Sequence, residues 1–184
     1  MDDLGPAPGI RPRPSLWRRL DAIARASFPL TCTVLLMLLA NAPFGIPGQA
    51  TLLPAIAIIS VYFWSLFRPP AMPPLAVFLL GLLLDLLGWL PLGTGPFCLL
   101  AVLAFCQRWR RGLANQGFLL VWLVFAGFAA GAATVIWGFA SLLTLRLMPA
   151  GPAAFQAVLT AALYPVLAIP FSQAQRSLAN PERA

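Results

Sequence analysis

The chain has 184 residues, of which 60% are hydrophobic and only 9% are charged. Soluble domains usually carry about a quarter charged residues, so this composition excludes an ordinary soluble globular protein and indicates an integral membrane protein. The net charge of +7 comes entirely from arginine. Because the arginines flank apolar blocks, they indicate membrane topology rather than nucleic-acid binding.

The N-terminal segment, residues 1–27, is basic and is expected to be cytoplasmic. Its first 15 residues are rich in Pro, Gly and charge, which is typical of a disordered segment. The next stretch, SLWRRLDAIARAS, puts Leu16, Leu20 and Ile23 on one helical face, after a candidate N-cap at Ser15. This pattern predicts a short amphipathic helix on the cytoplasmic membrane surface. Alternatively, the segment only supplies charge that orients the chain.

Six apolar blocks follow, and they predict an all-α, polytopic membrane domain of six transmembrane helices over residues 28–172. The blocks cover about residues 28–44, 51–67, 75–90, 96–107, 117–143 and 153–171, before a polar cytoplasmic tail at 173–184. If they cross in alternation, eleven of the twelve arginines lie on one side and only Arg146 lies on the other. The positive-inside rule then puts both termini in the cytoplasm. Ala40-Asn41-Ala42 resembles a signal-peptidase site, but the segment before it is longer than a usual signal peptide.

The third and fourth blocks are short. Residues 75–107 must provide two crossings and a turn, whereas two full spans alone need roughly 40 residues. Either the helices extend into the arginine-bearing interface, or the PLGTG turn lies below the outer surface, or both. A turn at membrane depth requires surrounding protein.

Asp85 is the only acidic residue between Asp21 and Glu182. It shares one narrow helical stripe with Gly81 and Gly88, and the two glycines would let another helix approach closely. We therefore expect the carboxyl group to face a packed interface and to bond a hydroxyl, indole or backbone donor. A structural anchor is the favoured role, and contact with a partner or ligand, or a proton relay, are the alternatives. The candidate side-chain donors are Tyr62, Trp64, Thr134 and Tyr164.

The fifth block carries a second pattern of small residues. Gly127 and Gly131 form a G-x-x-x-G pair, and Thr134 and Gly138 continue the same face. This pattern predicts helix packing, within the chain rather than between copies.

Catalytic and metal-binding patterns are missing from the sequence. It contains no His and no paired carboxylates, and its three cysteines have unrelated spacings. Neither an enzyme nor a cofactor or metal site is therefore expected. The cysteines are interpreted as small packing residues.

The stretch around Asp85 resembles the family of rod shape-determining proteins called MreD. The family pattern G-L-L-x-D-x-L-x-x-x-P-L-G is matched by Gly81, Leu82, Leu83, Asp85, Leu87, Pro91, Leu92 and Gly93. The preceding VYFWSLFRPP and the pair Tyr164-Pro165 also fit. The specific match covers about residues 54–95, and the rest agrees in hydropathy alone. The motif residues Gly81, Asp85, Gly88, Pro91, Leu92 and Gly93 are accordingly the candidate assembly site.

The resemblance implies a non-enzymatic subunit of the elongasome in the bacterial inner membrane. Such a subunit works with an MreC-like single-span protein, a RodA-like glycosyltransferase and a class B penicillin-binding transpeptidase, and indirectly with the MreB filament. It helps to direct lateral peptidoglycan synthesis and to maintain rod shape. The family fold is similar to the substrate-binding subunits of energy-coupling-factor transporters, so a vitamin-type uptake subunit is the alternative. An unrelated six-span scaffold is a third hypothesis. Short, nearly uncharged outer connections favour a packing subunit over a solute binder.

Overall fold

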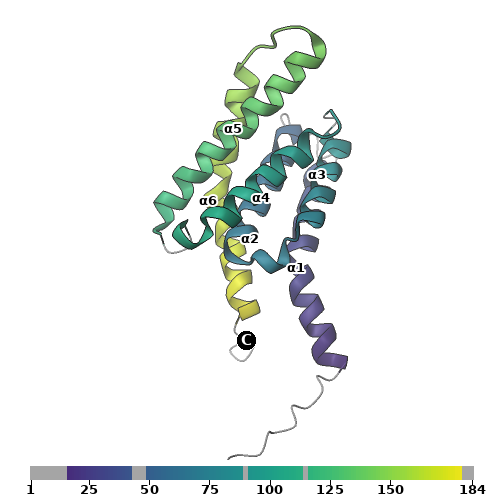
Figure 1. Cartoon of the computed structure of the whole chain (residues 1–184), viewed down its shortest axis with the longest axis vertical. Coiled ribbons are helices and arrows are strands. Elements are labelled where there is room, and N and C mark those ends of the chain that lie inside the picture. Colours follow the sequence, from purple (N-terminus) through teal and green to yellow (C-terminus); the bar gives the residue numbers. More distant parts are fainter. Residues whose placement is uncertain (1–15, 43–48, 89–90, 114–115, 180–184) are drawn as a thin grey trace, which may run out of the picture.

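The computed structural model describes residues 16–42, 49–88, 91–113 and 116–179. This part of the chain is entirely helical and contains no strand, so the predicted all-α class is confirmed. Figure 1 shows the helices running alternately up and down along the long axis of the molecule. The expected disorder of residues 1–15 and the end of the polar tail lie outside the described residues.

Within the described ranges, six α-helices and two short 3-10 turns follow the order of the apolar blocks. They are α1 (Leu16–Asn41), η1 (Gln49–Thr51), α2 (Leu52–Phe67), η2 (Pro69–Ala71), α3 (Pro74–Gly88), α4 (Thr94–Leu113), α5 (Phe118–Thr144) and α6 (Gly151–Ala179). The short amphipathic helix predicted at the N-terminus is the first part of α1, which continues without a break through Pro29. Helix α4 is longer than the fourth apolar block, because it continues through Arg108, Arg110 and Arg111, as one of the two predicted alternatives required.

Helix α2 is the centre of the core. Thirteen of its 16 residues are buried, as expected for a helix that is apolar on every side. It packs against α1, α3, α4 and α6. The fully buried Trp64 illustrates this position, since its ring lies 6.3 Å from Phe28 of α1 and 5.5 Å from Phe171 of α6.

Helices α5 and α6 form a long hairpin whose tip reaches past the other helices (Figure 1). Leu145, in the left-handed conformation with φ 50°, ends α5. The indole of Trp122 then donates to the Ala161 carbonyl of α6 across 2.9 Å. The hairpin is joined to the core through Tyr62, whose hydroxyl donates to the Val121 carbonyl across 3.0 Å.

Two helical segments are long and apolar enough to cross a membrane, residues 118–144 and 151–176. The other apolar helical segments, Ser27–Asn41, Leu52–Phe67 and Pro74–Gly88, are shorter. In the most apolar part of the two long segments, only 28% and 22% of the residues are buried. Most residues of these windows are therefore not fully buried by the rest of the chain.

Candidate functional site

Asp85 joins the last part of α3 to the first turn of α4. Its side chain is only 1% exposed. One carboxylate oxygen, Oδ2, accepts a hydrogen bond from the Gly93 N–H, and the other, Oδ1, accepts one from the Gly95 N–H, each across 2.7 Å. Both acceptor atoms of the buried acid are thus occupied by backbone donors.

The start of α4 explains why an acid is needed there. The first N–H groups of any helix have no partner within the helix, and they usually bond to a polar side chain at the N-cap. The residues that lead into α4, Pro91 to Gly93, offer no such side chain. Asp85 supplies the acceptor from the preceding helix, and its negative charge also suits the positive end of the α4 dipole. Asp85 therefore caps α4 from a distance in the sequence.

Two glycines allow α3 and α4 to approach closely enough for these bonds. A methyl group added at Gly81 would overlap the backbone of Pro96 and Gly95. A methyl group added at Gly95 would overlap the Gly81 carbonyl and the Asp85 carboxylate. Glycine is therefore required on both sides of the contact.

The turn between the helices uses the remaining motif residues. Gly93 has φ +101°, a conformation that favours glycine. The Pro91 carbonyl accepts the Thr94 N–H across 3.1 Å, which fixes the tight turn before α4. Leu92 is 73% exposed at the tip of this turn, and Gly88 is the half-buried last residue of α3.

The expectation for Asp85 is met in part. The acid is buried against a neighbouring helix and bonds backbone donors, as one of the predicted arrangements required. The candidate side-chain donors lie elsewhere: the Tyr62 hydroxyl bonds Val121, the Thr134 hydroxyl bonds the Ala130 carbonyl, and the Trp64 ring lies beside Phe171.

The fourth candidate donor, Tyr164, belongs to a buried aromatic cluster with Tyr62 and Phe125. Its ring centroid lies 5.8 Å from that of Tyr62 and 4.5 Å from that of Phe125. The cluster brings α2, α5 and α6 together. Aromatic pairs at such distances stabilise a core beyond the area they bury. Tyr164, part of the Tyr-Pro pair in the sequence, therefore has a packing role.

The sequence reasoning missed Gly95. Its signal was present in the pattern Gly93-Thr94-Gly95-Pro96, which places two small residues at the start of a helix that has no polar N-cap of its own. Such a helix start needs an acceptor from elsewhere in the chain, and Asp85 is the nearest acid in the sequence. Pairing the acid with this Gly-x-Gly would have identified the contact.

The small-residue face of α5 corrects the second prediction. Gly127, Gly131 and Thr134 are exposed, and a methyl group added at Gly127, Gly131 or Gly138 would meet nothing within 4 Å. The face that α5 buries instead includes Phe125, and Gly127 lies two residues, roughly 200° around the helix, from it. The predicted close packing of this stripe within the chain is therefore wrong.

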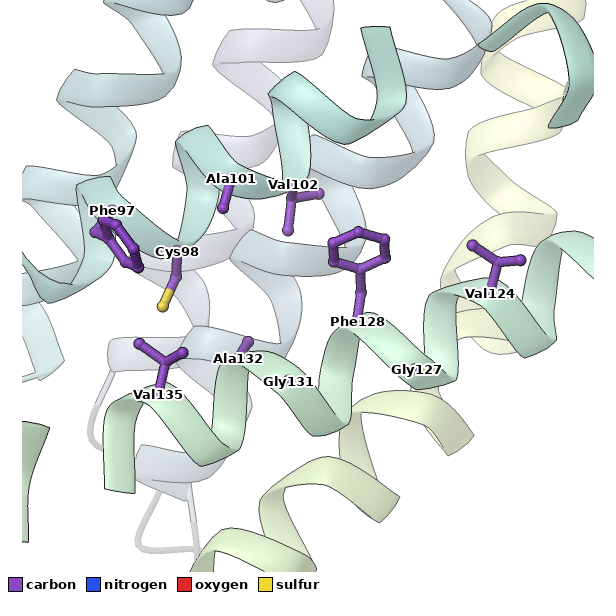
Figure 2. Close-up of a pocket in the computed structure, with 10 residues that line it drawn as sticks. All are labelled: Phe97, Cys98, Ala101, Val102, Val124, Gly127, Phe128, Gly131, Ala132 and Val135. Carbon is purple, nitrogen blue, oxygen red and sulfur yellow. The ribbon is translucent and has the colours of Figure 1, made fainter. Parts of the chain in front are cut away.

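Gly127 and Gly131 instead line an apolar groove between α4 and α5, with a volume of about 340 Å³. Figure 2 shows side chains of α4, including Cys98 and Val102, pointing across the groove toward Val135 and Phe128 of α5. The two helices are thus separated along this groove where the sequence predicts tight packing.

No protein-family model, curated protein or solved structure matches the chain. Among the described residues, no group of three or more His, Cys, Asp or Glu side chains could hold a metal ion. The cysteines are free, and Cys98 and Cys106 are buried. The α3–α4 junction holds two helices together at the Asp85 carboxylate.

Proposed function

We propose that the chain is a multi-pass protein of the bacterial inner membrane, with both termini in the cytoplasm, and a non-enzymatic subunit of the elongasome. In this role it assembles with an MreC-like single-span protein, a RodA-like glycosyltransferase and a class B penicillin-binding transpeptidase, and indirectly with the MreB filament. The assembly directs lateral peptidoglycan synthesis and maintains rod shape.

Exposed apolar side chains support the membrane part of the proposal. Leu119 and Leu123 of α5 are 66% and 57% exposed, and Val158 and Ile169 of α6 are 68% and 62% exposed. Few residues in the apolar windows of these helices are buried, and monomeric soluble proteins rarely expose large apolar patches. Hydrocarbon tails would cover these faces at no cost in hydration, and the helices satisfy their own backbone groups, as a membrane requires.

The arginines support the proposed orientation. Arg68 follows α2, Arg110 lies in the last turn of α4, and Arg176 lies near the end of α6. With helices that alternate in direction, these ends share one side of the membrane, and Arg146 between α5 and α6 lies on the other. An excess of arginine is typical of the cytoplasmic side.

The observation that carries the family part of the proposal is the α3–α4 junction. Each motif residue in this contact has its own role. Gly81 allows the close approach of α4, Asp85 accepts two N–H groups at its start, and Pro91 and Gly93 form the turn before it. These are the residues on which the resemblance to MreD rests, and their shared contact supports the proposal. Because the Asp85 side chain is only 1% exposed and accepts two backbone N–H groups at the start of α4, it does not face an open solute site, and this favours a scaffold over an uptake subunit.

A pull-down from native membranes tests the proposal. Tagged full-length protein would be extracted in mild detergent, and co-purified proteins would be identified by mass spectrometry. We expect the MreC-like protein and the wall-synthesis enzymes. A coupling membrane protein with paired ATPases, in the absence of wall enzymes, would instead establish the uptake role.

The matched control for this pull-down compares Gly81→Ala with Gly127→Ala. Both variants add one methyl group to an apolar helix, but only the first disturbs the α3–α4 junction. If the junction supports assembly, Gly81→Ala recovers less of the wall enzymes at equal protein level, and Gly127→Ala recovers the normal amount. Equal recovery of the wall enzymes by both variants would show that the junction does not support assembly.

A further inference from the structure

The helices fall into two groups of unequal apolar length. Helices α2 and α3 have 16 and 15 residues, which corresponds to about 24 and 22 Å, and the apolar segment of α1, Ser27–Asn41, is similar. The apolar segments of α5 and α6 have 27 and 26 residues, or about 40 Å each. The hydrocarbon core of a bilayer is about 30 Å thick. A flat bilayer of uniform thickness therefore cannot match both groups.

Helix α4 belongs to the short group although it has 20 residues. Its first charged residue, Arg108, lies about 21 Å from its start. Arg108 and the neighbouring Trp109 are exposed, and both residue types favour the membrane interface. Arg68 directly follows α2, and the contact of Cys106 with the Tyr62 carbonyl places the ends of α2 and α4 together. The apolar layer on this side is therefore about 6–9 Å thinner than a bilayer core.

The two kinds of mismatch are relieved in different ways. A helix that is too long for the bilayer can tilt or protrude, and the tip of the α5–α6 hairpin does lie beyond the α3–α4 turn along the long axis of the molecule (Figure 1). No rotation lengthens a helix that is too short. The shortfall on the α1–α4 side is therefore met by the bilayer, which becomes thinner around short helices.

The short helices have apolar side chains that face outward over most of their length. Leu75, Leu79 and Leu86 of α3 are exposed, and together they extend over about 16 Å of the helix. Leu35 is exposed near the middle of the apolar segment of α1, and Leu92 is exposed at the α3–α4 turn. Hydrocarbon in contact with this side must therefore fit between the turn at one end and the arginines at the other.

We propose that the α1–α4 side of the protein binds a locally thinned bilayer, in which phospholipids with short acyl chains pack against α1 and α3. Lipids with longer chains surround the α5–α6 hairpin, so that the protein holds a step in membrane thickness. Other short membrane helices are expected to gather on the thin side, because mismatch drives helix association. The inference rests on the proposed membrane embedding and not on the elongasome role.

Fluorescence quenching at single sites tests the proposal. The full-length protein, with its three cysteines replaced by alanine, would carry one exposed cysteine labelled with bimane. Leu79→Cys on α3 is matched to Val166→Cys on α6, at 55% and 61% exposure, and Leu35→Cys on α1 is matched to Val158→Cys on α6, at 66% and 68%. Each variant would be reconstituted with a brominated phosphatidylcholine and one competing phosphatidylcholine. The competitor carries myristoleoyl, oleoyl or erucoyl chains, in order of increasing length.

The competing lipid relieves quenching according to its affinity for the labelled face. At Leu79→Cys and Leu35→Cys we expect the myristoleoyl lipid to compete several-fold better than the erucoyl lipid, because the cost of mismatch grows with the difference in thickness. At Val166→Cys and Val158→Cys this preference should be absent or reversed. The same order of lipids at all four sites would overturn the proposal. A label on α1 and α3 that no brominated lipid quenches would also overturn it, because protein would then cover that side.

These outcomes are separate from those of the proposed function. Recovery of wall enzymes together with one order of lipids at all four sites would reject the thinned bilayer and leave the elongasome role intact. A preference for short chains at α1 and α3 alone would support the thinned bilayer even if no wall enzyme is recovered.

Discussion

Asp85 shows how one charged side chain is accommodated among leucines. Placing an Asp at the centre of a membrane helix costs about 2.5–3.5 kcal/mol on insertion scales. Here the carboxylate accepts two backbone N–H groups that would otherwise have no partner at the start of α4. The carboxylate and the N–H groups at the start of α4 therefore satisfy each other's hydrogen bonding. Removing either partner would leave the other one buried without a hydrogen bond, which is unfavourable.

Replacing Asp85 tests this capping role. In Asp85→Asn the amide oxygen retains one bond and leaves one N–H without an acceptor, which should destabilise the protein by about 1–3 kcal/mol. Asp85→Leu leaves two N–H groups unsatisfied and should cost roughly twice as much. Thermal unfolding of the purified variants in one detergent measures the order. If Asp85→Leu unfolds at the temperature of the parent protein, Asp85 is not the cap.

Gly81 tests the close approach of the two helices. Gly81→Ala should destabilise the protein by about 1–3 kcal/mol, because backbone atoms of α4 would have to move. Gly127→Ala is the control, and it should be neutral or slightly stabilising, since alanine favours a helix and its methyl group meets nothing. The same thermal assay compares them, and a larger loss in Gly127→Ala would contradict the assignment of the two glycines.

At the scale of elements, the hydropathy of the sequence predicted which segments are helices but not which faces they bury. The six apolar blocks correspond to the six helices. The prediction of contacts was wrong for α5, because composition does not show which side of an apolar helix faces the core. Gly127 and Gly131 have the spacing of a packing face, but α5 buries Phe125 and Ala129. A large aromatic side chain such as Phe125 gains more from burial than a glycine does.

The attachment of the α5–α6 hairpin to α2 depends on Tyr62. Tyr62→Phe keeps the aromatic contacts with Phe125 and Tyr164 but removes the hydroxyl that bonds Val121. We expect a loss of about 0.5–1.5 kcal/mol, the net value of one hydrogen bond. Tyr62→Ala should cost several times more, because it also leaves a cavity of about one aromatic ring. Equal losses in the two variants would mean that the rings contribute little.

At the scale of the whole molecule, charge and hydropathy predict a topology that contacts alone do not reveal. Arg146 is exposed between α5 and α6, and Arg176 is exposed near the end of α6. Arg146 lies before the start of α6 and Arg176 lies near its end, and this helix of 29 residues is about 44 Å in length. That length exceeds the roughly 30 Å of a bilayer core, so the two arginines can lie on opposite sides of a membrane.

Labelling of single cysteines tests this topology. In a background where Cys32, Cys98 and Cys106 are replaced by alanine, Arg146→Cys should react with an impermeant maleimide in intact spheroplasts. Arg176→Cys should react only after the membrane is made permeable. The reverse pattern would invert the orientation, and reaction of both residues in intact cells would argue against a membrane crossing between them.

The central place of α2 has a consequence for biosynthesis. This helix is made second, but its faces are covered by α1 from before it and by α3, α4 and α6 from after it. Trp64 and Phe63, for example, contact Phe171 close to the end of the chain. The packing around α2 is therefore incomplete until α6 has been synthesised. A chain truncated shortly before α6 would therefore leave one face of α2 uncovered. Quality-control proteases would then gain access to the core of the protein and not only to its truncated end.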